Sequence, residues 1–264
     1  GCEPNQSNLN KIKKNNVKII SDFYTPEIVN EKFDVILSLG VLEHIHEPGK
    51  FIKSQLKSLN QDGLIFFSVP NCEKKLMLGD LKIIQHEHWN YFTRDSIKHL
   101  LQNNGLTDIE LEISQNNANI FVWGRFSESG GIIYDNPQHD GQQVFKIFSD
   151  KLNLSNEIMI DRAKDILNKG KTIGFMSGGL ELMSIIPFIE NPRFFDNDTS
   201  KHGKYYPGFT NAIESPKNLI SNPCDELWIC ATDYNDEIIQ GLKTIISNQT
   251  KIWSIRDMLL KIHS

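Results

Sequence analysis

Two short histidine-rich segments contain the side chains of this chain best suited to proton transfer or ligand binding. His44 and His46 form one H-x-H pair, and His86 and His88 form a second pair around Glu87. An imidazole titrates near neutral pH, so it can take up or release a proton during a reaction. Such a pair can also hold a metal when alternate residues share one face of a strand. Because both pairs fall in predicted loops and no third ligand is evident, we expect no metal site.

Two carboxylates offer a second kind of chemistry at the predicted ends of neighbouring strands. Glu3 stands at what looks like the end of a strand, and Asp22 follows the apolar run 17–21 and precedes Phe23. In nucleoside-binding α/β domains, an acid at the position of Glu3 accepts hydrogen bonds from both ribose hydroxyls. A carboxylate beside an aromatic ring suits the amino group and the face of an adenine. The alternative is that Asp22 only caps a turn and that Phe23 belongs to the core.

A third group of candidate residues lies in the second half of the chain and is suited to bind anions. Gly178 and Gly179 fall between a predicted strand and a predicted helix over 180–189, where main-chain amides can receive an anion. Lys201 and Lys204 are suited to contact a diphosphate. The alternatives are an ordinary tight turn and a solvated lysine face.

The elements that must position these residues alternate between strands and helices. In the first half, the pattern predicts buried strands over 17–21, 33–39 and 63–69, helices over 48–59 and 93–104, and a final hairpin of strands 106–114 and 119–126. A strand, a helix and a strand in succession imply a parallel pair with a right-handed crossover. We therefore predict a mostly parallel sheet with an antiparallel edge.

A polar stretch with Gly130, Gly131, Pro137 and Gly141 separates this half from a second α/β pattern. A long helix is predicted to run to about Asn168, followed by strands over 172–176, 193–195, 227–231 and 252–255 and by helices over 180–189 and 236–246. The predicted organisation is a first domain over 1–126, a linker over 127–143 and a second domain over 144–264, both α/β and Rossmann-like.

The composition limits the classes of protein to which the chain can belong. Its 264 residues include 39% hydrophobic and 23% charged residues, which argues against a disordered tail and allows two ordinary domains. With 28 basic and 33 acidic residues, the net charge of −5 makes duplex nucleic acid a poor partner. No apolar stretch approaches the length of a membrane span, and the four cysteines are scattered. We expect a soluble cytoplasmic protein with reduced thiols and no membrane partner.

The segment 33–48 resembles the fourth-strand region of class I S-adenosylmethionine-dependent methyltransferases. It reads FDVILSLGVLEHIHEP, in which a strand leads into a V-L-E-H-I run beneath the methyl donor and then into a Pro-containing turn. The resemblance continues through 63–71 and 91–106. It implies S-adenosylmethionine as cofactor, bound by Glu3, Asp22, Phe23, Leu39 and Gly40.

Two further segments are similar to the sugar C-methyltransferases, which act on keto-sugars attached to nucleotides. QHEHWNYF, at 85–92, resembles their E-H-x-x-Y-F signature, and FDNDTSKHGKYYPG, at 195–208, resembles a stretch of their C-terminal domain. The resemblance implies a nucleotide-sugar substrate, held by Gln85, Tyr91, Gly178 and Lys201, in a surface-glycan or deoxysugar pathway.

The chemistry that this resemblance implies is methylation of a carbon next to a ketone. The carbon loses a proton, and the resulting enolate attacks the sulfonium methyl group in line. We predict His88 as the catalytic base, Glu87 as a group that orients a histidine or the substrate, and His44 as a group that binds the sugar or polarises the oxygen.

Some features depart from the family. The glycine-rich loop and its preceding strand are absent before Glu3, so the chain looks like an N-terminally truncated member, and Gln85 stands where relatives commonly carry a tyrosine. Two alternatives to the C-methyltransferase stay open: a non-catalytic module that binds a nucleotide-sugar, and a methyltransferase that acts on an oxygen or nitrogen acceptor. The sequence does not specify the sugar, its nucleotide or the oligomeric state.

Overall fold

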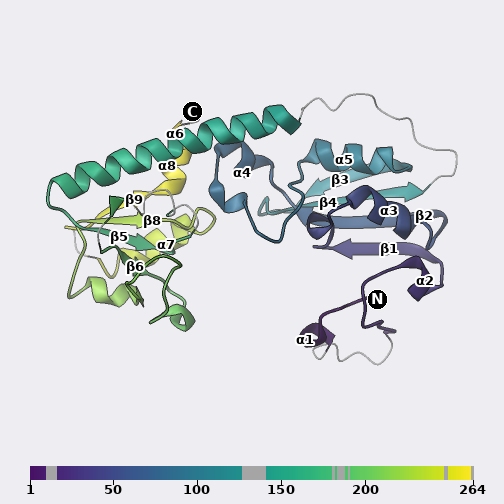
Figure 1. Cartoon of the computed structure of the whole chain (residues 1–264), viewed down its shortest axis with the longest axis horizontal. Coiled ribbons are helices and arrows are strands. Elements are labelled where there is room, and N and C mark those ends of the chain that lie inside the picture. Colours follow the sequence, from purple (N-terminus) through teal and green to yellow (C-terminus); the bar gives the residue numbers. More distant parts are fainter. Residues whose placement is uncertain are drawn as a thin grey trace. The chain divides into compact units, whose positions relative to one another are not determined.

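The computed structural model describes residues 1–9, 17–126, 141–179, 182, 188–189, 191–246 and 249–262. The chain divides into two compact units, each with its own sheet (Figure 1). The first unit comprises 1–73 and 85–140, and the second comprises 74–84 and 141–264. The segment 74–84, which lies inside the predicted first domain, thus packs with the second unit.

The first unit is built on a four-stranded sheet with the order β1-β2-β4-β3. Its strands are β1 (Phe33–Leu39), β2 (Leu59–Pro70), β3 (Leu106–Ile113) and β4 (Asn119–Phe126). The pair β1–β2 is parallel, whereas β2–β4 and β3–β4 are antiparallel. The predicted crossover and hairpin are therefore both present.

Two helices cover one face of this sheet. They are α3 (Pro48–Leu56) and α5 (Arg94–Asn103). Pro48 occupies the first turn of α3, where its missing N–H costs nothing, and Thr93 and Ser96 form a capping box at the start of α5. The buried side chains of both helices join the core of the strands through Ile52, Leu56, Ile97, Leu101, Leu59, Ile65, Phe67 and Val69.

The opposite face of the sheet carries exposed apolar side chains along β1. Val35, Leu37 and Leu39 are 51%, 63% and 60% exposed. The prediction of a buried strand over 33–39 is therefore wrong about its burial, because β1 is an edge strand that, among the described residues, pairs only with β2. The predicted strand over 17–21 is reduced to one parallel bridge between Cys2 and Ile20.

Short helical segments complete the first unit. They are α1 (Gln6–Leu9), α2 (Pro26–Val29) and a 3₁₀ turn, η1 (Leu42–His44).

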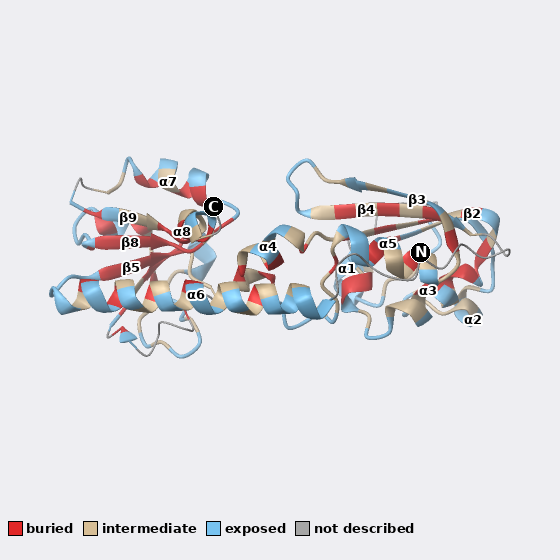
Figure 2. Ribbon diagram, turned by 90° about the horizontal axis from the view of Figure 1, so that it is seen from above, coloured by how far each residue is buried: buried red, intermediate tan, exposed pale blue. Residues whose placement is uncertain are grey.

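The second unit has a five-stranded sheet in which every pairing is parallel, with the order β7-β6-β5-β8-β9. Its strands are β5 (Ile173–Met176), β6 (Arg193–Phe195), β7 (Ile213–Glu214), β8 (Glu226–Ile229) and β9 (Lys251–Ser254). Figure 2 shows β5 and β8 buried along their length, as central strands covered on both faces must be. The predicted α/β class is confirmed.

One long helix, two helices of eight residues and a short helical segment accompany this sheet. They are α6 (Gly141–Asn168), α7 (Asn235–Leu242), α8 (Ile255–Ile262) and the pair α4 (Glu73–Leu78) and η2 (Leu81–Ile83); two further 3₁₀ turns are η5 (Thr199–Lys201) and η6 (Pro216–Leu219). Of the predicted linker, 127–140 lies outside the described residues, and so do most positions of the predicted helix 180–189. None of the described helices combines the length and hydropathy that spanning a membrane requires.

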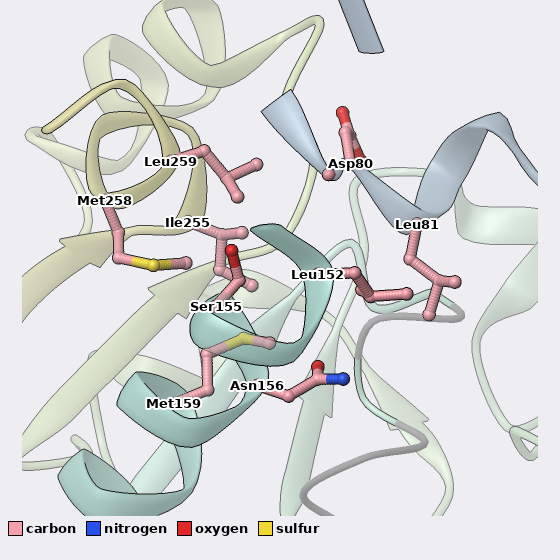
Figure 3. Close-up of a pocket in the computed structure, with 10 residues that line it drawn as sticks. Asp80, Leu81, Leu152, Ser155, Asn156, Met159, Ile255, Met258 and Leu259 are labelled. Atoms are coloured by element: carbon pink, nitrogen blue, oxygen red, sulfur yellow. The ribbon is translucent and has the colours of Figure 1, made fainter. Parts of the chain in front are cut away.

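Figure 3 shows a small pocket in the second unit, between α6, α8 and the segment 79–81. Its walls are mainly apolar and include Leu152, Met159, Ile255, Met258 and Leu259. None of the residues predicted to bind a donor or a substrate lines it.

Candidate functional site

The carboxyl end of β1 leads directly into the turn that carries Glu43 and His44. Gly40 has a left-handed φ of +63° and donates its N–H to the main-chain oxygen of Ser68, so the chain turns sharply as it leaves the sheet. The turn η1 follows at once and buries Glu43 while His44 stays partly exposed. A side chain at position 40 would place its Cβ 3.7 Å from Oε1 of Glu43, so glycine leaves that side of the carboxylate open.

The loop that carries His88 is held against this turn by Asn90. The amide group of Asn90 donates to the main-chain oxygens of Ile45, at 2.6 Å, and Leu42, at 3.3 Å. The main-chain N–H groups of Trp89 and Asn90 both donate to the oxygen of Glu43, at 2.9 and 3.1 Å. Four hydrogen bonds thus join two segments that are distant in the sequence.

This closure brings the imidazoles of His44 and His88 together, edge to face, with ring centroids 4.8 Å apart. Nδ1 of His44 lies 3.0 Å from the main-chain oxygen of Glu87. Because a carbonyl oxygen can only accept, Nδ1 carries the proton and the lone pair of His44 is on Nε2. That Nε2 lies 3.9 Å from Oε1 of Glu43.

Two polar atoms of this cluster are buried without a hydrogen-bond partner. One is Oε2 of Glu43, whose residue is only 4% exposed, and the other is Nδ1 of His88. Burial and, second, the neighbouring His44 lower the pKa of His88 below its ordinary value, so the neutral imidazole with a free lone pair is favoured. We call Glu43, His44 and His88 the imidazole–carboxylate cluster.

The other residues predicted around His88 lie in the same loop. The carboxylate of Glu87 is exposed and lies 3.5 Å from Nε2 of His86, so Glu87 orients His44 through its main-chain oxygen rather than its side chain. The hydroxyl of Tyr91 donates to the oxygen of Gln85 and accepts from its N–H. The ring of Tyr91 lies 6.1 Å from that of His88, centroid to centroid.

The predicted nucleoside acids, Glu3 and Asp22, each come shortly after one of the two residues of the parallel bridge between Cys2 and Ile20. Ile20 donates to the oxygen of Gly1, and Glu3 donates to the oxygen of Ile20, so Glu3 and Asp22 both follow the bridge on its carboxyl side. The Glu3 carboxylate accepts from the N–H of Asn5 and from the side chain of Asn8, whereas Asp22 accepts from the N–H of Phe23.

Comparisons with known proteins show what the first unit is similar to. Residues 2–111 match the family described as a methyltransferase domain. The matched residues include both predicted nucleoside acids and the imidazole–carboxylate cluster.

Three similar proteins illustrate the range of relatives. A ubiquinone biosynthesis O-methyltransferase of Pelagibacter ubique is 38% identical over 61 residues, which are 22% of this chain and 25% of that protein. The C-methyltransferase NovU of Streptomyces niveus is 23% identical over 221 residues, 78% of this chain and 53% of that protein. A solved methyltransferase of Archaeoglobus fulgidus has 11% identity and a TM-score of 0.38, covering 47% of this chain and 74% of that one. The chain spans between a quarter and about half the length of these curated relatives.

The residues predicted to hold the donor fit the adenosine part of S-adenosylmethionine. A carboxylate has about four acceptor positions, so Glu3 retains capacity for ribose hydroxyls beside its two hydrogen bonds. Phe23 is 72% exposed, which excludes the alternative that it belongs to the core and leaves its face available to a base. Leu39 is 60% exposed at the end of β1, directly before Gly40.

Two predicted substrate residues, Gly178 and Lys201, belong to the second unit. Nζ of Lys201 donates to the buried carboxylate of Asp196, at 2.8 Å, so its charge is already paired. Gly178 packs closely, since a Cβ there would lie 2.6 Å from a methyl carbon of Leu182 and 3.3 Å from the ring of Tyr206. This close packing is a structural reason for glycine at position 178.

Sequence reasoning gave no role to Glu43, the buried member of the cluster. The signal was the adjacent Glu-His pair directly after a strand, which places a carboxylate and an imidazole on one short turn. The prediction that no metal site exists rested on the lack of a third ligand, and the structure brings the carboxylate of Glu43 to the imidazoles of His44 and His88.

Proposed function

We propose that this chain transfers the methyl group of S-adenosylmethionine to the carbon next to the ketone of a nucleotide-linked keto-sugar. The observation that carries the proposal is that Glu43 and His44 directly follow the strand end at Leu39 and Gly40, and that the ring of His88 lies against that of His44. Two predicted donor residues and two predicted catalytic imidazoles are thus connected through one turn, and direct transfer needs donor and acceptor close together.

The transfer would proceed through an enolate. The sugar C–H loses its proton to a basic group of the cluster, and the electron pair left on the carbon attacks the methyl carbon in line. The new carbon–carbon bond forms as the carbon–sulfur bond breaks with its electrons going to sulfur. Among the three members, His88 is the base assigned by the sequence, and His44 faces the oxygen on which charge develops.

The choice of a carbon acceptor is supported by the similarity to a protein named a C-methyltransferase, which extends over 78% of this chain and thus into the second unit.

An oxygen acceptor is the second candidate, because two proteins named ubiquinone biosynthesis O-methyltransferase are 38% and 32% identical to this chain over 61 and 100 residues. The same cluster would then deprotonate a hydroxyl. Locating the transferred methyl group distinguishes the two candidates.

The test is to incubate the chain with S-adenosylmethionine carrying a ¹³C-methyl group and with nucleotide-linked 4-keto-6-deoxy sugars. We expect a product with the label on a ring carbon, seen by NMR. The variant His88→Ala should lose about 100-fold or more in turnover, since a positioned acid or base contributes at least that much. His46→Ala is the matched control, because His46 is an exposed imidazole that contacts Trp89.

Wild-type turnover by His88→Ala would rule out the cluster as the acceptor site. Label on oxygen would replace the first candidate with the second. Tight binding of the nucleotide-sugar without any methyl transfer would instead favour the non-catalytic binding module.

A further inference from the structure

The imidazole–carboxylate cluster presents lone pairs that no group in the described part of the chain satisfies. Oε2 of Glu43 and Nδ1 of His88 are both buried without a hydrogen-bond partner. Buried polar atoms in folded proteins are nearly always paired, so two such atoms in one cluster need an explanation. A carboxylate oxygen and an imidazole nitrogen are both ordinary metal ligands, so a cation can give each of them a partner.

The geometry of the cluster suits a metal ion. One ligand atom from each of Glu43, His44 and His88 lies within 4.8 Å of the other two. Around zinc, with bonds of about 2.1 Å, neighbouring ligand atoms are about 3.4 Å apart, so the groups would draw together by roughly 1 Å. His44 is already set for this task, because its Nδ1–H is bonded to the oxygen of Glu87 and its Nε2 lone pair points away from that bond. Carbonyl groups orient metal-binding histidines in this way.

The donor set selects the class of ion. Two imidazoles and one carboxylate suit zinc and neighbouring divalent transition metals, whereas magnesium and calcium prefer ligands that are all oxygen. The carboxylate supplies one negative charge and the imidazoles none, which favours a divalent cation over an anion. Three protein ligands also leave a coordination position open, as in catalytic rather than structural sites.

We propose that Glu43, His44 and His88 bind one divalent transition-metal ion. Binding is independent of the proposed function, because it needs neither the donor nor the acceptor.

An effect of the ion on methyl transfer rests on the proposed function. As a metal ligand, His88 would not be free to act as the base that removes the C–H proton. The transfer proposed above is therefore that of the metal-free chain, and bound zinc would inhibit it.

The experiment is a zinc titration of the whole chain, without donor or acceptor, in competition with a coloured chelator. We expect one equivalent to bind at micromolar concentration or tighter. Glu43→Gln, His44→Ala and His88→Ala should each weaken binding by at least about tenfold, because loss of an outer hydrogen-bond partner alone can cost that much. His46→Ala and His86→Ala should bind as the wild type does, since each removes a neighbouring exposed imidazole.

Cobalt binding provides a second readout. It does not require that Glu43→Gln folds, a variant that is changed at a buried residue. Co²⁺ in this site should give visible absorption bands of a low-coordinate nitrogen and oxygen site, without thiolate charge-transfer absorption from the cysteines. These bands should disappear in His44→Ala and His88→Ala, with the fold checked by circular dichroism. The proposal is overturned if no ion binds at micromolar concentration, or if these two variants bind zinc and cobalt as the wild type does. Neither result bears on whether the chain transfers methyl groups.

Discussion

His44 donates a hydrogen bond from Nδ1 to the main-chain oxygen of Glu87, 3.0 Å away and 43 residues further along the chain. This bond fixes the tautomer of His44 and turns its other nitrogen toward Glu43. The ring of His44 therefore has one orientation before any ligand arrives. An orientation set by the fold is what both a catalytic imidazole and a metal ligand require.

The first prediction concerns Asn90, which holds the turn of Glu43 and the loop of His88 together. Asn90→Ala removes two hydrogen bonds and leaves the main-chain oxygens of Leu42 and Ile45 without that donor. We expect the free energy of unfolding to fall by about 1–3 kcal/mol, as for other unsatisfied buried groups. Urea denaturation followed by tryptophan fluorescence measures it. Asn103→Ala, an exposed asparagine bonded to His99, should change stability by no more than about 0.5 kcal/mol; equal losses in both variants would contradict the role of Asn90.

Local patterns were sufficient to predict most strands and helices. The bounds of β1, β4 and β6 match the expected ranges, because an apolar run between turn residues is a local signal. The run 17–21 has the same appearance but forms one bridge, since a strand needs a partner that its own sequence does not encode. The segment 73–84 forms two short pieces, α4 and η2, and gave no regular helical pattern in the sequence. Its position depends on contact with α6, where a Cβ at Gly79 would lie 2.6 Å from the main-chain nitrogen of Leu152.

The sequence was sufficient to predict the histidines of the candidate site but not its acidic residue, Glu43. His44 and His88 stand in recognisable motifs, so their types and neighbours identified them. Glu43 looks like a solvated acid in the sequence, because glutamate is rarely buried. Its burial results from the closure of a distant loop through Asn90, which no local pattern reports.

The second prediction concerns the exposed ring of Phe23. If the adenine of the donor stacks on it, Phe23→Ala should weaken binding of S-adenosylmethionine by about 1–3 kcal/mol, the usual value of one base stacked on an aromatic ring. That is roughly a fivefold to hundredfold rise in Kd, measured by calorimetry. Phe145→Ala removes a similarly exposed ring, 68% accessible, from α6 and should leave Kd unchanged. An unchanged Kd in Phe23→Ala would remove Phe23 from the donor site.

The third prediction concerns a buried ion pair in the second unit. Arg162 donates from Nε to Oε1 of Glu226 at 2.6 Å, and the indole N–H of Trp228 shares the same oxygen. Arg162→Met leaves the buried carboxylate without its cation, which should cost about 3–5 kcal/mol in unfolding free energy. The double variant Arg162→Met/Glu226→Gln should recover part of this loss, because the uncompensated charge is gone.

The exposed pair of Arg94 and Glu73 provides the control for this measurement. Both side chains are more than a third exposed, so Arg94→Met should cost at most about 1 kcal/mol. If Arg162→Met and Arg94→Met had equal effects in urea denaturation, burial would not be the decisive factor.

The fourth prediction is a dependence of stability on pH through Glu214. Arg193 binds both oxygens of this carboxylate, at 2.9 and 2.8 Å, and its hydrogen bonds lower the pKa of Glu214, with a smaller contribution from Asn218. Because the folded pKa is below the unfolded one, the stabilisation is complete above the unfolded pKa and is lost as pH falls through the folded value. Unfolding free energies measured from neutral pH down to about pH 3 should therefore decline less steeply in Arg193→Met than in the wild type. Lys50→Met, which breaks an exposed pair with Glu47, should retain the wild-type slope because solvent screens that pair. Parallel curves for Arg193→Met and the wild type would show that Glu214 does not contribute to the acid sensitivity.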